Sequence, residues 1–131
     1  MTIGMASTLR DARNNAITTA AGGNAVITIY SGTRPATGGT ATTALVALTC
    51  GSTFAPASSG GVLTLNAITN GTAGNTGTAT WARLTTSSAT FVFDMSVTAT
   101  GGGGDLILNS TSISSGATVS ISSATLTDGN P

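Results

Sequence analysis

The sequence has 131 residues, among them four arginines and four aspartates, with no lysine, glutamate or histidine. This length predicts one domain with a core that needs no cross-links, and the single cysteine, Cys50, excludes an intrachain disulfide and favours folding in a reducing cytoplasm. A hydrophobic share of 40% with no net charge excludes intrinsic disorder. The charged share of 6% is far below the usual share of about a quarter, so the surface is expected to be covered by other molecules.

The N-terminal residues predict an arm followed by one helix. Residues 1–7 carry no charge and can lie along a neighbouring molecule. Thr8 is the expected N-cap, Asp11 follows three residues later, and apolar residues at helical spacing continue to a stop at Gly22-Gly23. The segment lacks the basic start and apolar run of a secretory signal, and no stretch reaches the ~20 apolar residues of a membrane span. We therefore expect no membrane insertion.

From residue 24 onward the hydrophobic period changes to two, which predicts strands. Polarity comes mainly from 27 threonines and 15 serines, a composition that suits β-sheets. Turn residues separate candidate strands at 25–30, 44–50, 61–68, 78–85, 90–97, 105–110 and 117–127. The expected fold is mainly β: an antiparallel β-sandwich, jelly-roll or immunoglobulin-like, of about seven to eight strands with one short N-terminal helix. Residues 1–23 form the arm and helix and residues 24–131 the sandwich, in a single domain.

Residues 80–97 are predicted to form one hairpin with its turn at Ser87-Ser88. On the core face this turn gives three pairs: Leu84 with Phe91, Ala82 with Phe93, and Thr80 with Met95. The other face then carries Trp81, Arg83 and Asp94, with Arg83 diagonal to Asp94. An odd-length loop would shift the register by one residue and put Trp81 opposite Met95, so the assignment of faces depends on the turn.

The position of Trp81 has two interpretations of nearly equal weight. In the first, Trp81 is a core residue facing the second sheet, while Arg83 extends to the rim and pairs with Asp94. In the second, these three side chains form an outward patch that another subunit covers, because Trp and Arg are common interface anchors.

The sequence contains no motif that indicates catalysis or cofactor binding. Without histidine and glutamate there is no Ser-His-Asp or Cys-His arrangement, and the aspartates are dispersed. The run Gly101 to Gly104 precedes a strand and no Gly-Lys-Ser/Thr, so it is expected to be a flexible hairpin loop. Cys50 is expected to be a small buried residue, and Asp105 and Asp128 are single acids beside glycine. We expect no enzyme activity, no cofactor and no metal.

Charge also bears on the partners. Balanced arginines and aspartates give no basic footprint for nucleic acid, although Arg10 and Arg13 lie on adjacent helical turns. Strand edges are usually protected by lysines and other charges, and these strands carry almost none. Edges and outer faces are therefore expected to be buried against other copies or a partner, as in a building block.

Five segments in order along the chain carry a family resemblance: STLRDARNNAITTA, ITIYSGTRPATGG, SGGVLTLNAIT, GTATWARL and VFDMSV. In them the chain resembles a family of small structural proteins of tailed bacteriophages and prophages, most specifically at residues 29–35 and 79–83. The resemblance implies a virion component without catalytic residues, assembled in the host bacterial cytoplasm.

Within that setting the leading hypothesis is a capsid decoration or cement protein that contacts other copies of itself and the major capsid protein. The alternatives are a tail or head-to-tail connector subunit and, from a different class, a host-surface or glycan-binding module. The candidate interface residues are Trp81, Arg83, Asp94, Tyr30, Arg34, Arg10 and Arg13.

Overall fold

A computed structural model of the protein describes residues 3–128 and is mainly β with one N-terminal helix, as predicted. In chain order the elements are α1 (Ser7–Ala21), β1 (Val26–Ser31), β2 (Thr43–Thr49), β3 (Val62–Thr64), β4 (Gly71–Thr72), β5 (Gly77–Thr85), β6 (Phe91–Ala99), β7 (Leu106–Leu108), β8 (Ser112–Ile113), β9 (Thr118–Val119) and β10 (Ile121–Thr127). The start of the predicted arm and the turn expected after Asp128 lie outside the described residues. Within residues 3–128, no helix has the length and apolar character needed to cross a membrane.

Helix α1 begins and ends close to the predicted positions. Ala6 precedes its first turn and no side chain caps it, so the prediction of Thr8 as N-cap is wrong. The reason is tertiary, because the Asp11 carboxylate is used in contacts to a distant loop and not in a capping box. Gly22 ends the helix as predicted, at a φ of 69°, and its N–H donates to the Thr18 carbonyl at 3.2 Å.

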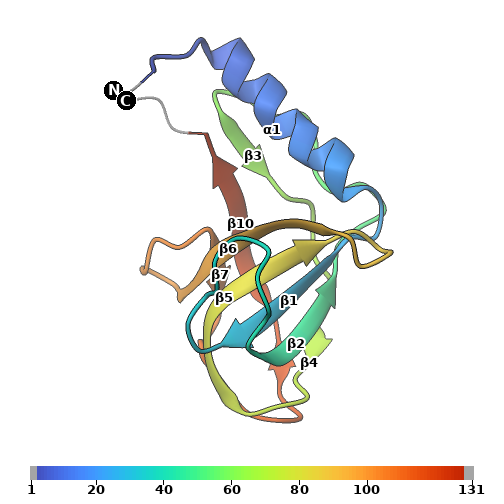
Figure 1. Ribbon diagram of the computed structural model, residues 1–131, viewed down its shortest axis with the longest axis vertical. Helices are drawn as coiled ribbons and strands as arrows, with labels where there is room; N and C mark the ends of the chain where they lie inside the picture. Colours follow the sequence, from blue (N-terminus) through green and yellow to red (C-terminus); the bar gives the residue numbers. More distant parts are fainter. Residues whose placement is uncertain (1–2, 129–131) are drawn as a thin grey trace.

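Eight strands form one sheet in the order β2-β1-β5-β6-β7-β10-β3, with β8 paired to the start of β5 (Figure 1). The pairing is antiparallel except between β6 and β7, where Val97 lies beside Leu106 in a parallel pair. The expected hairpin at Gly101 to Gly104 is therefore wrong. Gly101 and Gly103 adopt φ angles of 88° and 75°, which lets the chain return to β6 within a few residues.

A second, two-stranded sheet connects the segment beside β2 to the segment that precedes β10. The Thr69 N–H donates to the Thr49 carbonyl at 3.0 Å, and the Gly74 N–H donates to the Leu45 carbonyl at 2.9 Å, so residues 69–74 cover the outer edge of β2. Within this segment, β4 pairs with β9, which leads directly into β10. The strands thus enclose the core in a β-sandwich-like arrangement.

The core is aliphatic, and α1 packs across one end of it. Its most buried members, each at most 1% exposed, are Ile27, Ile29, Leu48, Leu63, Leu84, Leu106 and Leu108. Ala21 and Ile17 bring α1 onto this cluster. Cys50 is buried as predicted, and burial raises the pKa of its thiol to about 11.

The hairpin of β5 and β6 has most of the predicted faces but a different register. Ser87-Ser88 do form the centre of the turn, but Ala89 follows with a φ of 65° and lengthens the loop by one residue. A bulge beside Leu84 adds a second shift, so the pairs are Leu84 with Phe93, Ala82 with Met95, and Arg83 with Asp94. Two shifts of one residue restore the original parity beyond the bulge, so the predicted faces are correct for residues 80–84 and 93–97. Between the turn and the bulge only one shift applies. Phe91, predicted on the core face opposite Leu84, therefore lies beside Thr85 on the face of Arg83, and the predicted pairs are wrong.

Candidate protein interface

The sheet face opposite the core carries a row of aromatic and charged side chains from β1, β5 and β6, which we call the Trp81 cluster: Tyr30, Trp81, Arg83, Phe91 and Asp94. The Tyr30 and Trp81 rings stack with centroids 4.3 Å apart and an interplanar angle of 13°. The Arg83 guanidinium carbon lies 5.3 Å from the Trp81 ring centroid and 5.1 Å from that of Phe91. Stacking and cation–π contacts therefore run continuously along the cluster.

Residues 32–42 fold over this cluster and form a third layer. The Trp81 Nε1–H donates to Thr42 Oγ1 at 3.0 Å, and the Gly38 N–H donates to Asp94 Oδ2 at 3.4 Å. Trp81 is only 1% exposed. Trp81 is buried, as the first interpretation predicts, but it lies on the face away from the core cluster, and a loop of its own chain covers it in place of a second sheet. It shares that face with Arg83 and Asp94, as the second interpretation predicts, but its own chain covers it where another subunit was expected. Gly38-Gly39 indicated a turn in the sequence, but no local pattern shows where a long loop packs.

The predicted pair of Arg83 and Asp94 is confirmed. Arg83 Nε donates to Asp94 Oδ1 at 2.7 Å and Nη2 donates to Oδ2 at 3.0 Å, a two-pronged contact. The side chains are 13% and 6% exposed. The hydrogen bonds from Arg83 lower the pKa of the Asp94 carboxyl, and the same contact raises the pKa of Arg83.

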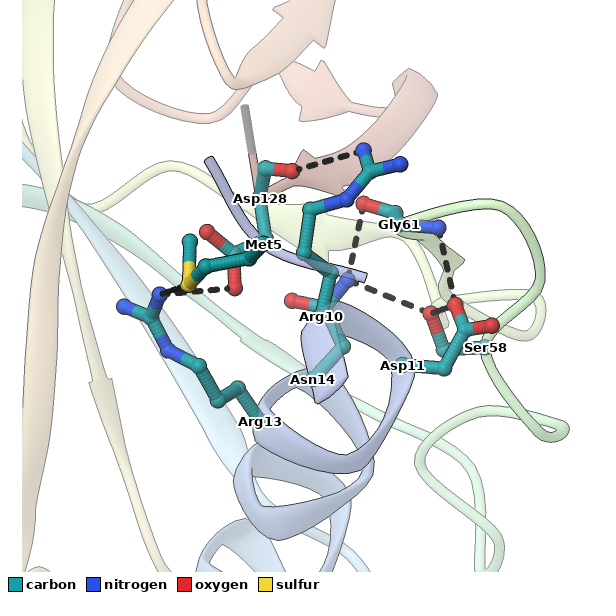
Figure 2. A network of polar contacts seen from close by, with 8 residues as sticks. All are labelled: Met5, Arg10, Asp11, Arg13, Asn14, Ser58, Gly61 and Asp128. Atoms are coloured by element: carbon teal, nitrogen blue, oxygen red, sulfur yellow. Dashed lines mark hydrogen bonds and ion pairs between the residues drawn. The ribbon is translucent and has the colours of Figure 1, made fainter. Parts of the chain in front are cut away.

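A second polar network, the α1 clamp, fixes the helix to the loop before β3 (Figure 2). Asp11 Oδ1 accepts hydrogen bonds from the Gly61 N–H at 2.8 Å and the Ser58 hydroxyl at 2.9 Å. Asn14, which is 3% exposed, donates from Nδ2 to the Gly61 carbonyl at 2.9 Å and to Ser58 Oγ at 3.1 Å. The backbone hydrogen bond from Gly61 lowers the pKa of Asp11. Sequence reasoning missed these contacts because their partners lie some 47 positions apart.

The two predicted helix arginines join the α1 clamp to the end of β10 (Figure 2). Arg10 Nη1 donates to the Asp128 carbonyl oxygen at 3.2 Å, across 118 positions of sequence. Arg13 Nη1 lies 3.2 Å from Asp128 Oδ2 and 3.1 Å from the Met5 sulfur, with 56% of the Arg13 side chain exposed. Both arginines therefore serve internal contacts.

A hollow of about 430 Å³ lies where the two clusters approach each other, lined by Arg13, Asn14, Ile17, Phe93, Asp94, Met95, Asp105, Leu126, Thr127 and Asp128. Four of these side chains are charged, in a sequence with only eight charged residues. The Asp105 carboxylate accepts from the Ser96 N–H at 3.2 Å and the Ser96 hydroxyl at 3.0 Å. Within residues 3–128 no cation pairs with Asp105, so the hollow is acidic.

The structure thus divides the predicted interface residues into two groups. Tyr30, Trp81, Arg83 and Asp94 belong to the Trp81 cluster, whereas Arg10 and Arg13 belong to the α1 clamp. Arg34 is exposed in the loop over the Trp81 cluster and is the one charged side chain within residues 3–128 with no hydrogen bond or ion pair. The sequence analysis missed the exposed large apolar side chains, which are Ile3 (69%), Leu9 (50%), Phe91 (38%) and Val62 (37%).

In the part of the chain that the structure describes, no three acidic or cysteine side chains gather as a metal site. Comparison of the chain with protein-family models, curated proteins and solved structures gives no match.

Proposed function

We propose that this protein is a structural component of a bacteriophage virion, a capsid decoration protein that stabilises the head through protein–protein contacts. The observation that carries the proposal is the internal use of charge. Apart from Arg34, each charged side chain within residues 3–128 has a hydrogen-bond or ion-pair partner in its own chain. Most of the remaining exposed residues are threonine, serine, glycine, alanine and asparagine.

Burying such a surface against another protein has a low desolvation free energy. Uncharged hydroxyl and amide groups cost far less to remove from water than ionised groups do, and hydrogen bonds across the contact offset that cost. A chain with no net charge also has little electrostatic repulsion between copies. Repeated over a lattice, modest contacts of this kind add up to a large stabilisation.

The resemblance to phage structural proteins supports the virion setting. Its two most specific segments, residues 29–35 and 79–83, lie on adjacent strands, and Tyr30 pairs directly with Trp81. The residues that carry the resemblance therefore build the Trp81 cluster and its covering loop. They have a structural task, which agrees with a family of structural proteins.

A tail or connector subunit is the second candidate function. β6 and β10 each leave part of one strand edge unpaired beside the hollow. Such edges favour directional contacts between copies, and contacts that run head to tail build rings.

Immunogold labelling of purified particles tests the proposal, with antibodies against this chain and a phage that carries its gene. A decoration protein gives label over the head and a copy number, by quantitative mass spectrometry, that matches the capsid lattice. Deleting the gene should then lower the temperature at which heads release DNA, and adding purified protein back should restore it. Label on the tail would favour the second candidate, and particles without the chain would refute both.

A further inference from the structure

The large sheet contains a gap one strand wide. β7 pairs with β6 only from Val97 to Ala99, and with β10 only as far as Ala124. Within the described chain, β6 before Ser96 and β10 after Ala124 have no strand partner on the side that faces β7. Ser96 itself is hydrogen-bonded to Asp105, the residue that precedes β7. Their other sides are occupied, by β5 and β3 respectively. Two otherwise paired strands thus each leave one edge open toward the same space.

Neighbouring hydrogen bonds show which backbone groups face this gap. On the β3 side, the Leu65 N–H donates to the Ala124 carbonyl and the Asp128 N–H donates to the Gly61 carbonyl. Because backbone groups alternate along a strand, the N–H and C=O of Thr127 point the other way, into the gap. On β6, the Ser96 N–H points toward Asp105, so by the same alternation the N–H and C=O of Asp94 also point into the gap.

The dimensions fit one added strand. Two strands that flank a third lie about 10 Å apart, which is the width needed between β6 and β10. An inserted segment of three residues is about 10 Å long. The hollow of about 430 Å³ occupies this place, with β6 and β10 as its walls and Arg13, Asn14 and Ile17 of α1 on one face. A strand inserted there would pair with both edges and rest its inward side chains on Ile17, Phe93 and Leu126.

We propose that the occupant is the N-terminal arm, residues 3–6, of a second copy of this chain. The inference rests on the proposed function only in that both require copies to touch. Ile3 is the most exposed large apolar side chain within residues 3–128, at 69%. Residues 3–6 belong to no helix or strand and carry no charge. In an extended strand, side chains alternate between the two faces. Ile3 and Met5 would therefore point inward, and Gly4 would point outward.

In its own molecule the arm lies at the rim of the gap and not inside it. Met5 contacts Arg13 and lies close to Asp128 (Figure 2). The arm leaves the start of α1 above the end of β10 (Figure 1), and it would have to reverse its direction just before Ser7 to enter the gap. The arm of a neighbour has no such restriction. Each copy then gives one arm and receives one, either reciprocally in a dimer or head to tail in a ring.

The first test compares two substitutions by light scattering and sedimentation over a range of concentrations. Ile3→Asp should weaken self-association about 10- to 100-fold, the range expected when one large apolar side chain is no longer buried. Leu9→Asp makes the same chemical change on exposed Leu9 of α1 and should leave the association constant unchanged. Equal effects of the two substitutions, or a wild-type protein that stays monomeric at every concentration, would overturn the proposal.

The second test traps the contact. In a Cys50→Ala background, one copy carries Ile3→Cys and a differently tagged copy carries Leu126→Cys, with circular dichroism to confirm that both are folded. Mild oxidation should give a disulfide-linked pair of the two tags. Linkage equal to that of a Leu9→Cys control would overturn the arm contact, as would efficient linkage within single molecules that carry both cysteines.

The outcomes of these tests separate this inference from the proposed function. A wild-type protein that is always monomeric but labels phage heads would remove the arm contact and leave the decoration role intact. Arm-dependent association of a chain that no particle contains would support the arm contact and refute the virion role.

Discussion

The pair of Arg83 and Asp94 offers the most informative single perturbation of stability. Replacing Arg83 by methionine removes both hydrogen bonds to Asp94 and leaves a carboxylate that is 6% exposed without its cation. Breaking one side of a buried pair costs about 3–5 kcal/mol, and the Gly38 N–H remains as one donor to Asp94, so we expect a loss of about 3 kcal/mol in unfolding free energy. Asp94→Asn should cost less, about 2 kcal/mol, because the amide oxygen still accepts from Arg83 and the guanidinium keeps its ring contacts.

Urea unfolding measured by tryptophan fluorescence suits this test, because Trp81 is the only tryptophan and touches Arg83. In a double-mutant cycle the two losses should be non-additive by about 2 kcal/mol. Thermal midpoints should fall by roughly 3–6 °C for each kcal/mol lost, as expected for a domain of this size. Asp105→Asn is the matched control, since Asp105 binds only Ser96, and its effect should stay below about 1 kcal/mol. Additive losses, or an Asp94→Asn effect no larger than the control, would refute the account of the Trp81 cluster.

Three further predictions concern the α1 clamp, acid and the buried thiol. Asn14→Ala removes two hydrogen bonds at a site only 3% exposed and should lower the unfolding free energy by about 2–3 kcal/mol, measured by urea unfolding against an Asn15→Ala control. The pKa values of Asp11 and Asp94 are lowered below 3.8 in the folded protein, so their stabilisation is complete above about pH 5 and is lost as the pH falls through the folded values; Asp94→Asn should flatten this dependence in acid unfolding curves. Because burial raises the pKa of Cys50 to about 11, a disulfide reagent at pH 8 should label it only as fast as the protein opens, and labelling that is equally rapid with and without urea would contradict its burial.

Parity explains why the sequence predicts the hairpin faces better than the hairpin pairs. Alternation assigns Trp81, Arg83 and Asp94 to one side for any even total shift, and the positive φ of Ala89 together with the bulge at Leu84 gives an even shift. The pairs themselves depend on loop geometry, and a positive φ at alanine has no sequence signal.

The contacts that position the candidate interface are long-range, and this limits what the sequence can predict. Asp11 near the start of the 15-residue helix resembles the acidic residue of a capping box in the sequence. In the structure its carboxylate binds Ser58 and Gly61 on a distant loop. The parallel pair of β6 and β7 was missed for a different reason. Parallel strands usually need a connection of a dozen or more residues, whereas the glycines from Gly101 to Gly104 make a very short one possible.

Edge protection connects the fold to the arm contact. A sheet without lysines can protect its edges by pairing, and residues 69–74 do so for β2. The open edges of β6 and β10 lie instead beside Arg13 and three aspartates, Asp94, Asp105 and Asp128. Since Asp105 has no cation within the described chain, an excess of negative charge surrounds the gap. It should repel segments that carry acidic residues and admit an uncharged arm.

Gly4 allows a direct test of this selectivity, because a Cβ atom added there would have no neighbouring atom within 4 Å. Gly4→Glu and Gly4→Lys should therefore leave the monomer equally stable in urea unfolding. Self-association should weaken about five-fold or more with glutamate, which adds a like charge to the rim of the acidic gap, and should not weaken with lysine. The difference should shrink as salt is added, since partly exposed charges are screened. Equal association of the two variants at low salt would mean that the charges around the gap do not select its occupant. Apolar contacts alone would then bind the arm in the gap.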